Sequence, residues 1–471
     1  MNPWKIITDQ DVEAIHQATL QVLSEVGIVL DHPQIRNQLL DSGGTENNDR
    51  VQIPPELVEK SIENSTKKVR TRGRDGNMIT LGDGSLHWHN LGGARDVYDP
   101  VSGKVRRATL QDVQDATRLL DALEQATTIT PFFTPIDVPG ELMSLAMYRY
   151  ALPHTTKPLQ GPGVQTAREV KFSVEMAEVI GPVTEVLTLS VSPISPLTFP
   201  ADLVESMVEI ARYGIPFAPL PCPTAGTTAP MSLAGSLTQQ NAEVLASLVI
   251  TQMVKPGLPM IYCGRLAMME PRTGISIWGG VEMGMASAAT VQIGHRYGFP
   301  VNVYGFSTNS HTLELQNGYE RAMNSLLPAL AGADELSGIG EMAAGVTGSF
   351  AQMVVDNDIA ASVRRVLRGF DVNQDSLAID VIKNAMDNQH NYMAQRHTIK
   401  YLRGGELYHE SLGVRRSFDE WEKSGRVGLA ENAQAKAELI LAEHQVPPLE
   451  DDQERELKKI MLAAEEELVK S

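Results

Sequence analysis

Polar and charged side chains gather where short apolar runs of this sequence end. His89 lies near the end of the run SLHWHN, Gln160 lies within KPLQGPG, and Arg265 ends LPMIYCGR. Further along, His311 follows the run PVNVYGFSTNS, and Glu341 lies at the end of ELSGIGE. One carboxylate, a guanidinium and imidazoles among many hydroxyl groups are suited to binding and orienting a small charged molecule.

Aromatic side chains near the same run ends predict a site for a small cation. A quaternary ammonium is attracted to the electron-rich face of an aromatic ring. Core packing is an equally good interpretation of each ring, because inward-facing positions of a sheet are filled by bulky side chains. The rings that could form such a cage are Trp88, Phe133, Tyr262, Tyr304 and Phe306.

Two cysteines indicate a competing chemistry. Cys222 and Cys263 each lie near the end of an apolar run, and Zn²⁺ binds thiolates readily. Two ligands do not complete a tetrahedral site, so His89, His311 or Glu341 would have to join them. A zinc enzyme is therefore an alternative, whereas the preferred interpretation assigns no metal ligand. No P-loop, dinucleotide-binding glycine pattern or G-x-S-x-G nucleophile elbow occurs in the sequence.

A repeating order of strand and helix positions the candidate residues. From residue 85, eight short apolar runs alternate with eight segments of helical length and periodicity. Strict alternation predicts a parallel sheet, and eight units favour closure into a (β/α)8 TIM barrel. Since such a barrel holds its active site at the carboxyl ends of the strands, the run ends are expected to lie together.

The predicted α/β fold has three parts. Residues 1–84 read as an N-terminal extension of helices and a β-hairpin, 85–372 as the barrel, and 373–471 as a C-terminal helical extension. The helical and charged character of the two extensions predicts a homo-oligomer, because they lie outside the barrel repeat and are free to supply contacts between subunits.

The composition excludes several classes of protein. The 471 residues carry a formal net charge of -18, which repels nucleic-acid phosphates and anionic lipid. No run of about 18 apolar residues predicts a membrane span, and the N-terminus lacks the apolar segment of a signal peptide. Two cysteines suit a reducing compartment, so the sequence predicts a cytoplasmic protein that binds neither nucleic acid nor membrane.

Several segments resemble the trimethylamine methyltransferase family. They are LSEVGIVLDHP, HNLGGARDVYDPVSGKVRRAT, GFSTNSHTLELQNGYERAMNSLLPALAGADELSGIGEMAAG and SFAQMVVDNDI. The resemblance covers most of the chain and implies a (β/α)8 barrel. It also implies a reaction in which a methyl group moves from a methylated amine to Co(I) of a corrinoid. The corrinoid (cobalamin) is carried by a separate small protein, so no cofactor is bound tightly by this chain.

The absence of pyrrolysine refines the expected substrate. Family members that act on trimethylamine contain pyrrolysine, whereas this sequence has only standard residues. The sequence therefore resembles the branch that demethylates quaternary amines such as glycine betaine. A quaternary ammonium leaves as a neutral tertiary amine and needs no activating electrophile. Catalysis then depends on orienting one N–CH3 bond and excluding water, in one-carbon metabolism of the methanogenic or acetogenic type.

The expected reaction assigns roles to the candidate residues. Glu341 and His311 are the predicted catalytic side chains, and Arg265, Arg95 or His311 would anchor a substrate carboxylate. Two alternatives remain open: a zinc-dependent barrel enzyme that uses the two cysteines, and a barrel that only docks a corrinoid protein. The predicted substrate-binding residues are Tyr262, Tyr304, Phe306, Phe133, Arg265, Asn309, Gln160 and His89.

Overall fold

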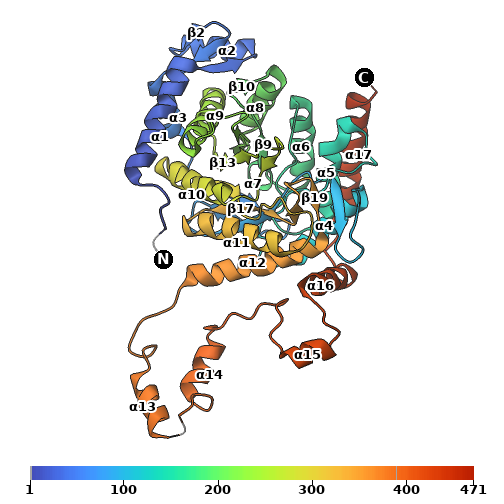
Figure 1. The fold of residues 1–471 in the computed structure, drawn as a ribbon. Helices are drawn as coiled ribbons and strands as arrows, with labels where there is room; N and C mark the ends of the chain where they lie inside the picture. The colour runs from blue at the N-terminus through green and yellow to red at the C-terminus, as the bar shows by residue number, and fades with distance from the viewer. Residues whose placement is uncertain (1–2, 389, 471) are drawn as a thin grey trace.

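Helices surround a set of short parallel strands in the computed structural model, which describes residues 3–388 and 390–470 (Figure 1). A helix follows each of the eight predicted apolar runs, as the periodicity indicates. These helices are α4 (Leu110–Ala122), α5 (Met143–Ala151), α6 (Ala167–Ile180), α8 (Ala201–Tyr213), α9 (Leu233–Val254), α10 (Val281–Arg296), α11 (Leu315–Leu330) and α12 (Phe350–Arg368).

Six of the predicted apolar runs form strands that pair in parallel. One sheet has the order β13-β16-β17-β6 and a second pairs β11 with β9. Parallel strands with intervening helices confirm the predicted α/β class. The strands are β6 (His87–Asn90), β9 (Leu189–Val191), β11 (Phe217–Pro219), β13 (Tyr262–Gly264), β16 (Val301–Tyr304) and β17 (Glu335–Ile339).

The other two runs contribute only isolated bridges to the parallel pairing, one of them between Phe133 and Ala94. Ile129 and Leu159 pair in parallel, and the backbone nitrogen of Gln160 donates to the oxygen of Ile129 at 2.7 Å. Proline explains the lack of longer strands, because Pro131 and Pro158 have no backbone N–H to donate to a ladder.

The N-terminal residues form the helices and hairpin that the sequence predicts, together with a small sheet that it does not. A capping box between Thr8 and Asp11 starts α1 (Asp9–Gln21), and a π-helical turn, η1 (Val22–Val26), follows it. The small sheet has the order β10-β1-β3-β2, and its strands are too short to show an alternating pattern. The remaining N-terminal elements and the strands of this sheet are β1 (Ile28–Leu30), α2 (Pro33–Asp41), β2 (Thr45–Asn47), β3 (Arg50–Gln52), α3 (Pro55–Asn64), β4 (Val69–Arg72), β5 (Met78–Leu81) and β10 (Thr198–Phe199).

The segments that connect the strands and helices contain further short elements. Hairpins form between β7 and β8 and between β18 and β19, and β14 pairs with β12 and β15. These elements are β7 (Asp96–Asp99), β8 (Lys104–Arg107), η2 (Gly140–Leu142), η3 (Leu152–His154), α7 (Val183–Val186), β12 (Thr224–Ala225), β14 (Ala267–Met269), β15 (Ser276–Ile277), β18 (Glu341–Met342) and β19 (Thr347–Gly348).

After α12 the chain projects from the body, and its last two helices pack on the body again. Two helices, α16 (Leu429–Glu443) and α17 (Asp451–Leu468), pack on α12 and on α6. One hydrophobic core includes Val12 of α1 and Leu457 of α17, so both ends of the chain share it. Between α12 and α16 the chain projects from the body (Figure 1) and carries α13 (Ile379–Asp387), α14 (Arg396–Arg403) and α15 (Phe418–Lys423). In the described part of the chain, no helix combines the length and apolar character needed to cross a bilayer.

Candidate active site

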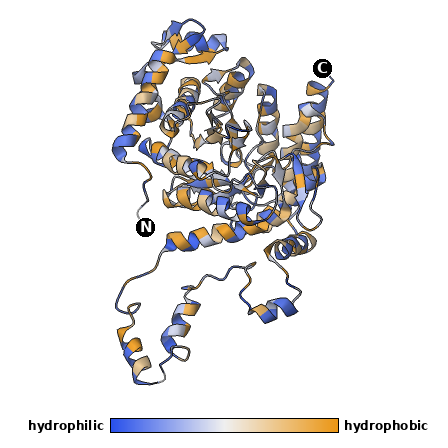
Figure 2. Ribbon diagram, in the orientation of Figure 1, coloured by the Kyte–Doolittle hydropathy of each residue, from blue (hydrophilic) through white to orange (hydrophobic). Residues whose placement is uncertain are grey.

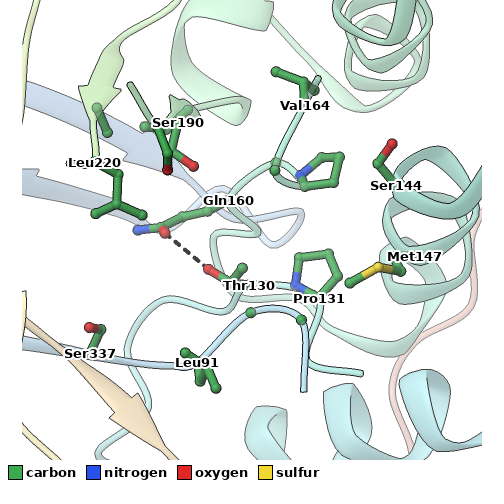
Figure 3. Close-up of a pocket in the computed structure, with 18 of the residues that line it drawn as sticks. Leu91, Thr130, Pro131, Ser144, Met147, Gln160, Val164, Ser190, Leu220 and Ser337 are labelled. Carbon is green, nitrogen blue, oxygen red and sulfur yellow. Dashed lines mark hydrogen bonds between the residues drawn. The ribbon is translucent and has the colours of Figure 1, made fainter. Parts of the chain in front are cut away.

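A cavity of about 440 Å³ lies at the carboxyl ends of the parallel strands. Figure 3 shows polar groups from several strands around it, with α5 closing one side. The side chain of Thr130 donates a hydrogen bond of 3.0 Å to Oε1 of Gln160 across this space. The volume is in the range of small-molecule sites. Lining residues include His89, Thr130, Ser144, Met147, Gln160, Ser190, Leu220, Arg265, Asn302, Tyr304, Glu335 and Ser337.

A buried carboxylate, Glu335, is the principal charged group of the cavity. Its Oε1 accepts hydrogen bonds from Thr128 (2.6 Å) and Gln160 (3.0 Å), and its Oε2 accepts one from Asn302 (2.5 Å). Burial alone would raise the pKa of Glu335, but the positive charge that His89 carries when it is protonated at low pH and the hydrogen bonds to the carboxylate outweigh burial and lower it. The carboxylate is therefore negatively charged at neutral pH.

The imidazole beside this carboxylate is neutral. Nδ2 of Asn302 lies 2.8 Å from Nε2 of His89, and since an amide nitrogen can only donate, Nε2 accepts and the ring proton is on Nδ1. Burial also lowers the pKa of His89. His89 is 3.9 Å from Glu335, and within residues 3–388 and 390–470 no lysine or arginine forms an ion pair with that carboxylate.

The guanidinium of Arg265 is held by neighbouring groups. Nη1 donates to the carbonyl oxygens of Gly264 and Asn302 at 3.0 Å each, and Nη2 donates to Ser337 at 2.9 Å and to the side-chain oxygen of Asn302. Its Cζ atom also lies over the ring of Tyr304, 4.5 Å from the ring centroid. All four Nη hydrogens are thus engaged, so Arg265 supplies positive charge to the cavity without a free Nη pair for a bidentate contact.

Four of the ten side chains expected from the sequence line the cavity: His89, Gln160, Arg265 and Tyr304. The rings of Phe133 and Phe306 are instead in the core, where Phe306 lies 4.9 Å from Trp88. Tyr262 points toward the helices and donates a hydrogen bond of 2.8 Å to Asn241. Side chains alternate along a strand, and the neighbours of Tyr262 in the chain are the ones that face the cavity.

The other three expected residues lie beyond the strand ends, in segments that do not line the cavity. Asn309 accepts hydrogen bonds of 2.7 Å from the backbone nitrogens of Trp278 and Gly279 and so fixes two loops together. His311 is exposed. Glu341 is buried, and its carboxylate accepts a hydrogen bond of 3.3 Å from the backbone nitrogen of Thr308.

The buried position of Glu341 predicts a pH-dependent stability. Burial raises the pKa of Glu341 from about 4.5 to about 7. A protonated, neutral carboxyl therefore favours the folded state, and stability is lost as pH rises from 4.5 through 7. We expect Glu341→Gln to remove this loss, so that the free energy of unfolding relative to wild type rises by about 2–3 kcal/mol between pH 4.5 and 8. Denaturant titrations at both pH values measure this; a pH-independent difference would contradict it.

Sequence reasoning missed Glu335, Asn302 and Ser337, although the pattern contained a signal for them. Within ELSGI, Glu335 and Ser337 alternate with an apolar residue, as do Asn302 and Tyr304 within VNVY. Alternation places both members of each pair on one face. Glu341 was expected in the site because it lies at the end of the last run, whereas the inward-facing carboxylate is Glu335, at the start of the same run.

The two cysteines do not form a metal site with other side chains. Cys263 lines the cavity and is buried, which raises the pKa of its thiol to about 12, whereas Cys222 is exposed. Across the described ranges, no group of three or more His, Cys, Asp or Glu side chains is arranged to hold a metal ion. The ligand set that the zinc alternative needs is therefore not assembled in those ranges.

The sequence is similar to that of one family of known proteins over nearly its whole length. A profile of the family described as "Trimethylamine methyltransferase (MTTB)" matches residues 1–468. A trimethylamine methyltransferase from Methanosarcina barkeri is 29% identical over 470 residues, covering 97% of this chain and 94% of the relative. A glycine betaine methyltransferase from Desulfitobacterium hafniense is 27% identical over 458 residues, covering 95% and 94%.

A solved structure has the same fold. The crystal structure of the monomethylamine methyltransferase from Methanosarcina barkeri aligns with a TM-score of 0.55 at 15% sequence identity. The alignment covers 94% of this chain and 89% of that chain. At this level of identity the likeness concerns the fold alone.

Proposed function

The chain belongs to the trimethylamine methyltransferase family, and we propose that it transfers a methyl group from a quaternary amine to the Co(I) corrinoid of a separate protein. Glycine betaine is the favoured substrate. The observation that carries this proposal is the charged, buried carboxylate of Glu335. It lines the cavity, and no lysine or arginine among the described residues forms an ion pair with it.

The parallel segments are further proposed to close into one (β/α)8 barrel. The four-stranded sheet supplies four neighbours, and β9 with β11 supplies two more. Backbone hydrogen bonds from Thr127 to Trp88 (2.9 Å) and from Gly161 to Thr188 (3.0 Å) support the joins at the two bridge segments. The parallel bridge between Phe217 and Met260 supports the remaining join. Such a closed order brings the run ends to a single mouth.

A permanent cation fits this cavity better than a titratable amine does. The carboxylate of Glu335 is ionised and forms no ion pair with a lysine or arginine among the described residues, so a ligand that brings a permanent positive charge is attracted to it in the desolvated cavity. A tertiary amine carries a positive charge only while it is protonated, and without its proton it is a neutral amine with a poor leaving group. A quaternary ammonium has no N–H and keeps its charge. We therefore propose that Glu335, more than an aromatic cage, balances the substrate cation.

The reaction requires little proton chemistry from this chain. When the N–CH3 bond breaks, its electron pair stays on nitrogen and a neutral tertiary amine leaves, while Co(I) supplies the electron pair of the new bond to carbon. The chain's residues orient the substrate and exclude water. A substrate carboxylate would lie toward the positive charge of Arg265, where the hydroxyl of Ser190 also lines the cavity.

Apolar side chains around the mouth are suited to docking the corrinoid-carrying protein. Each lies on a connection that follows a strand and precedes a helix, which is the side of the fold that holds the cavity. Exposed apolar groups at such positions mark interaction surfaces. They are Ile136, Ile194, Met231, Ile275 and Val346. With both cysteines as free thiols, a cytoplasmic location is the proposed setting.

A substrate panel tests the proposed function. We expect purified protein with Co(I)-cobalamin as acceptor to methylate cobalt from glycine betaine, followed by absorbance. Trimethylamine should react at least about tenfold more slowly, since the loss of about 1.4 kcal/mol of transition-state stabilisation has that effect. Proline betaine and carnitine, which share the cation and a carboxylate, show how far the pocket tolerates larger substrates. Equal or faster reaction of trimethylamine, or no reaction with any quaternary amine, would contradict the proposal.

A further inference from the structure

The segment of residues 370–403, here called the arm, exposes an unusual amount of apolar surface. It projects from the body and carries α13 and α14 (Figure 1), and Ala385 is its single buried residue among those described. Orange, hydrophobic positions are visible along α13 in Figure 2. The arm's exposed large apolar side chains are Phe370, Val372, Leu377, Ile379, Ile382, Met386, Tyr392, Met393, Ile399 and Leu402.

The two short helices of the arm need a packing partner to be stable in water. In the described chain no other helix or strand packs extensively on α13 or α14, and their contacts are within the arm, such as Lys400 with Asp375 at 2.6 Å. These helices have 9 and 8 residues. Isolated helices shorter than about 12 residues are marginal in water, so most of their stability must come from packing of their apolar face.

The charge of the arm differs from that of the rest of the chain. Its four acidic residues are matched by four basic residues, while the whole chain carries -18. A neutral, apolar surface is not repelled by an acidic body. Large, apolar surfaces of this kind are typical of permanent subunit interfaces, whereas transient encounters use smaller and more polar ones.

A matching surface is exposed on α11. Leu315, Tyr319 and Met323 are spaced by four residues, form one stripe along the helix, and are 87%, 62% and 41% exposed. The arm of the same chain does not cover them. Two copies related by a two-fold axis can each place the arm on α11 of the other, so that one contact is made twice.

The position of the arm disfavours the corrinoid protein as its partner. The arm starts after Gly369, at the end of α12, and α12 begins at Phe350 beside the β18–β19 hairpin at the cavity end of the strands. A helix of 19 residues spans about 28 Å. A protein that delivers cobalt to the mouth of the cavity would therefore bind far from the point at which the arm leaves the body.

We propose that the arm is an assembly element whose α13 and α14 pack on the α11 stripe of a second copy of this chain. The proposal does not depend on the substrate or on the acceptor of the methyl group. It assigns a role to a segment whose apolar side chains would otherwise remain in water.

Light scattering on the full-length protein tests the assembly. We expect a dimer, or a closed multiple of one, at micromolar concentration. Ile382→Glu combined with Met386→Glu should reduce the mass to that of a monomer, because both changes charge the apolar face of α13. Asn384→Glu adds a charge to the opposite face of the same helix and should leave the mass unchanged. A monomeric wild type, or a double variant that stays assembled, overturns the proposal.

Cross-linking tests the docking surface in protein whose fold is undisturbed. In a Cys222→Ser background, one batch carries Met386→Cys and another carries Tyr319→Cys. After mixing and exchange, a bismaleimide should give a product of twice the chain mass that neither batch gives alone. A product from the Met386→Cys batch by itself would show arms packing on arms and would overturn the assignment of α11, as would the absence of any product.

Discussion

Replacing Glu335 by glutamine is expected to lower kcat/KM for a quaternary amine by about 100-fold or more, in steady-state assays with Co(I)-cobalamin. Removing one partner of a desolvated charge pair costs about 2–5 kcal/mol, and each 1.4 kcal/mol is tenfold. Glutamine keeps the size of the side chain and its carbonyl can still accept from Thr128 and Gln160. The change therefore removes the charge while most of the local hydrogen bonding is kept.

A matched variant separates this effect from a general loss of buried charge. Asp334 precedes Glu335 in the chain and is also buried, but its carboxylate points away from the cavity and accepts from Val301 (2.9 Å) and His295 (2.8 Å). Asp334→Asn should keep kcat/KM within about threefold, since a group outside the site changes no contact with the substrate. If both variants lost activity equally, or if Glu335→Gln kept full activity, Glu335 would not be the counter-charge of the substrate.

The pattern of the effect also distinguishes binding from chemistry. If Glu335 balances a cation that exists before and after binding, most of the loss should appear as a higher KM, because the interaction is made in the ground state as well. The value of kcat should stay unchanged or rise slightly, since the positive charge on nitrogen decreases as the N–CH3 bond breaks and the carboxylate then stabilises the transition state less than the bound substrate. A loss confined to kcat would instead favour a role in positioning the N–CH3 bond.

The alternation of strand and helix made the class of the fold predictable from sequence, and the same signal failed where proline interrupts it. Segments such as α4 and α11 have a clear helical period, so their existence could be predicted. The runs around Ile129 and Leu159 read as strands because they are apolar, yet Pro131 and Pro158 limit them to isolated bridges. Short strands such as β1 to β3 show too few residues to reveal a period.

The site was only partly predictable, because distance from a strand end is a weaker guide than the direction of a side chain. Arg265 and Tyr304 were expected and line the cavity, whereas Tyr262 lies on the same strand as Cys263 but faces the helices. Glu335 begins its strand and was overlooked. The closeness of Asn302 to Glu335 depends on the register between β16 and β17, which no single-strand pattern contains.

The arm illustrates a different limit. The sequence predicts a charged helical tail, and the apolar faces of α13 and α14 are visible in it only as ordinary amphipathic spacing. A periodic apolar face indicates that a helix packs against another apolar surface. Which surface that is can be seen only in the folded structure. The structure shows that the chain's own core does not provide it.

A buried ion pair behind the cavity holds the last two strand ends in place. Nη1 of Arg321 lies 2.9 Å from a carboxylate oxygen of Asp356, and both side chains are fully buried. Arg321 also donates to the carbonyl oxygen of Phe306 at 2.7 Å, and Asp356 accepts from the backbone nitrogen of Gly340 at 2.7 Å. The pair thus connects α11 and α12 to the chain after β16 and to the turn between β17 and β18.

Asp356→Ala is expected to lower the free energy of unfolding by about 3–5 kcal/mol, because it leaves the guanidinium of Arg321 buried without a counter-charge. The double variant Arg321→Met with Asp356→Leu should recover most of that loss, since two apolar side chains of similar volume leave no uncompensated charge. Denaturant unfolding of the two variants and wild type at one pH measures both differences. A cost below about 1 kcal/mol for the single change would mean that water or another group compensates Arg321. A double variant no more stable than the single would show that the hydrogen bonds to Phe306 and Gly340, more than the charges, determine the stability of this region.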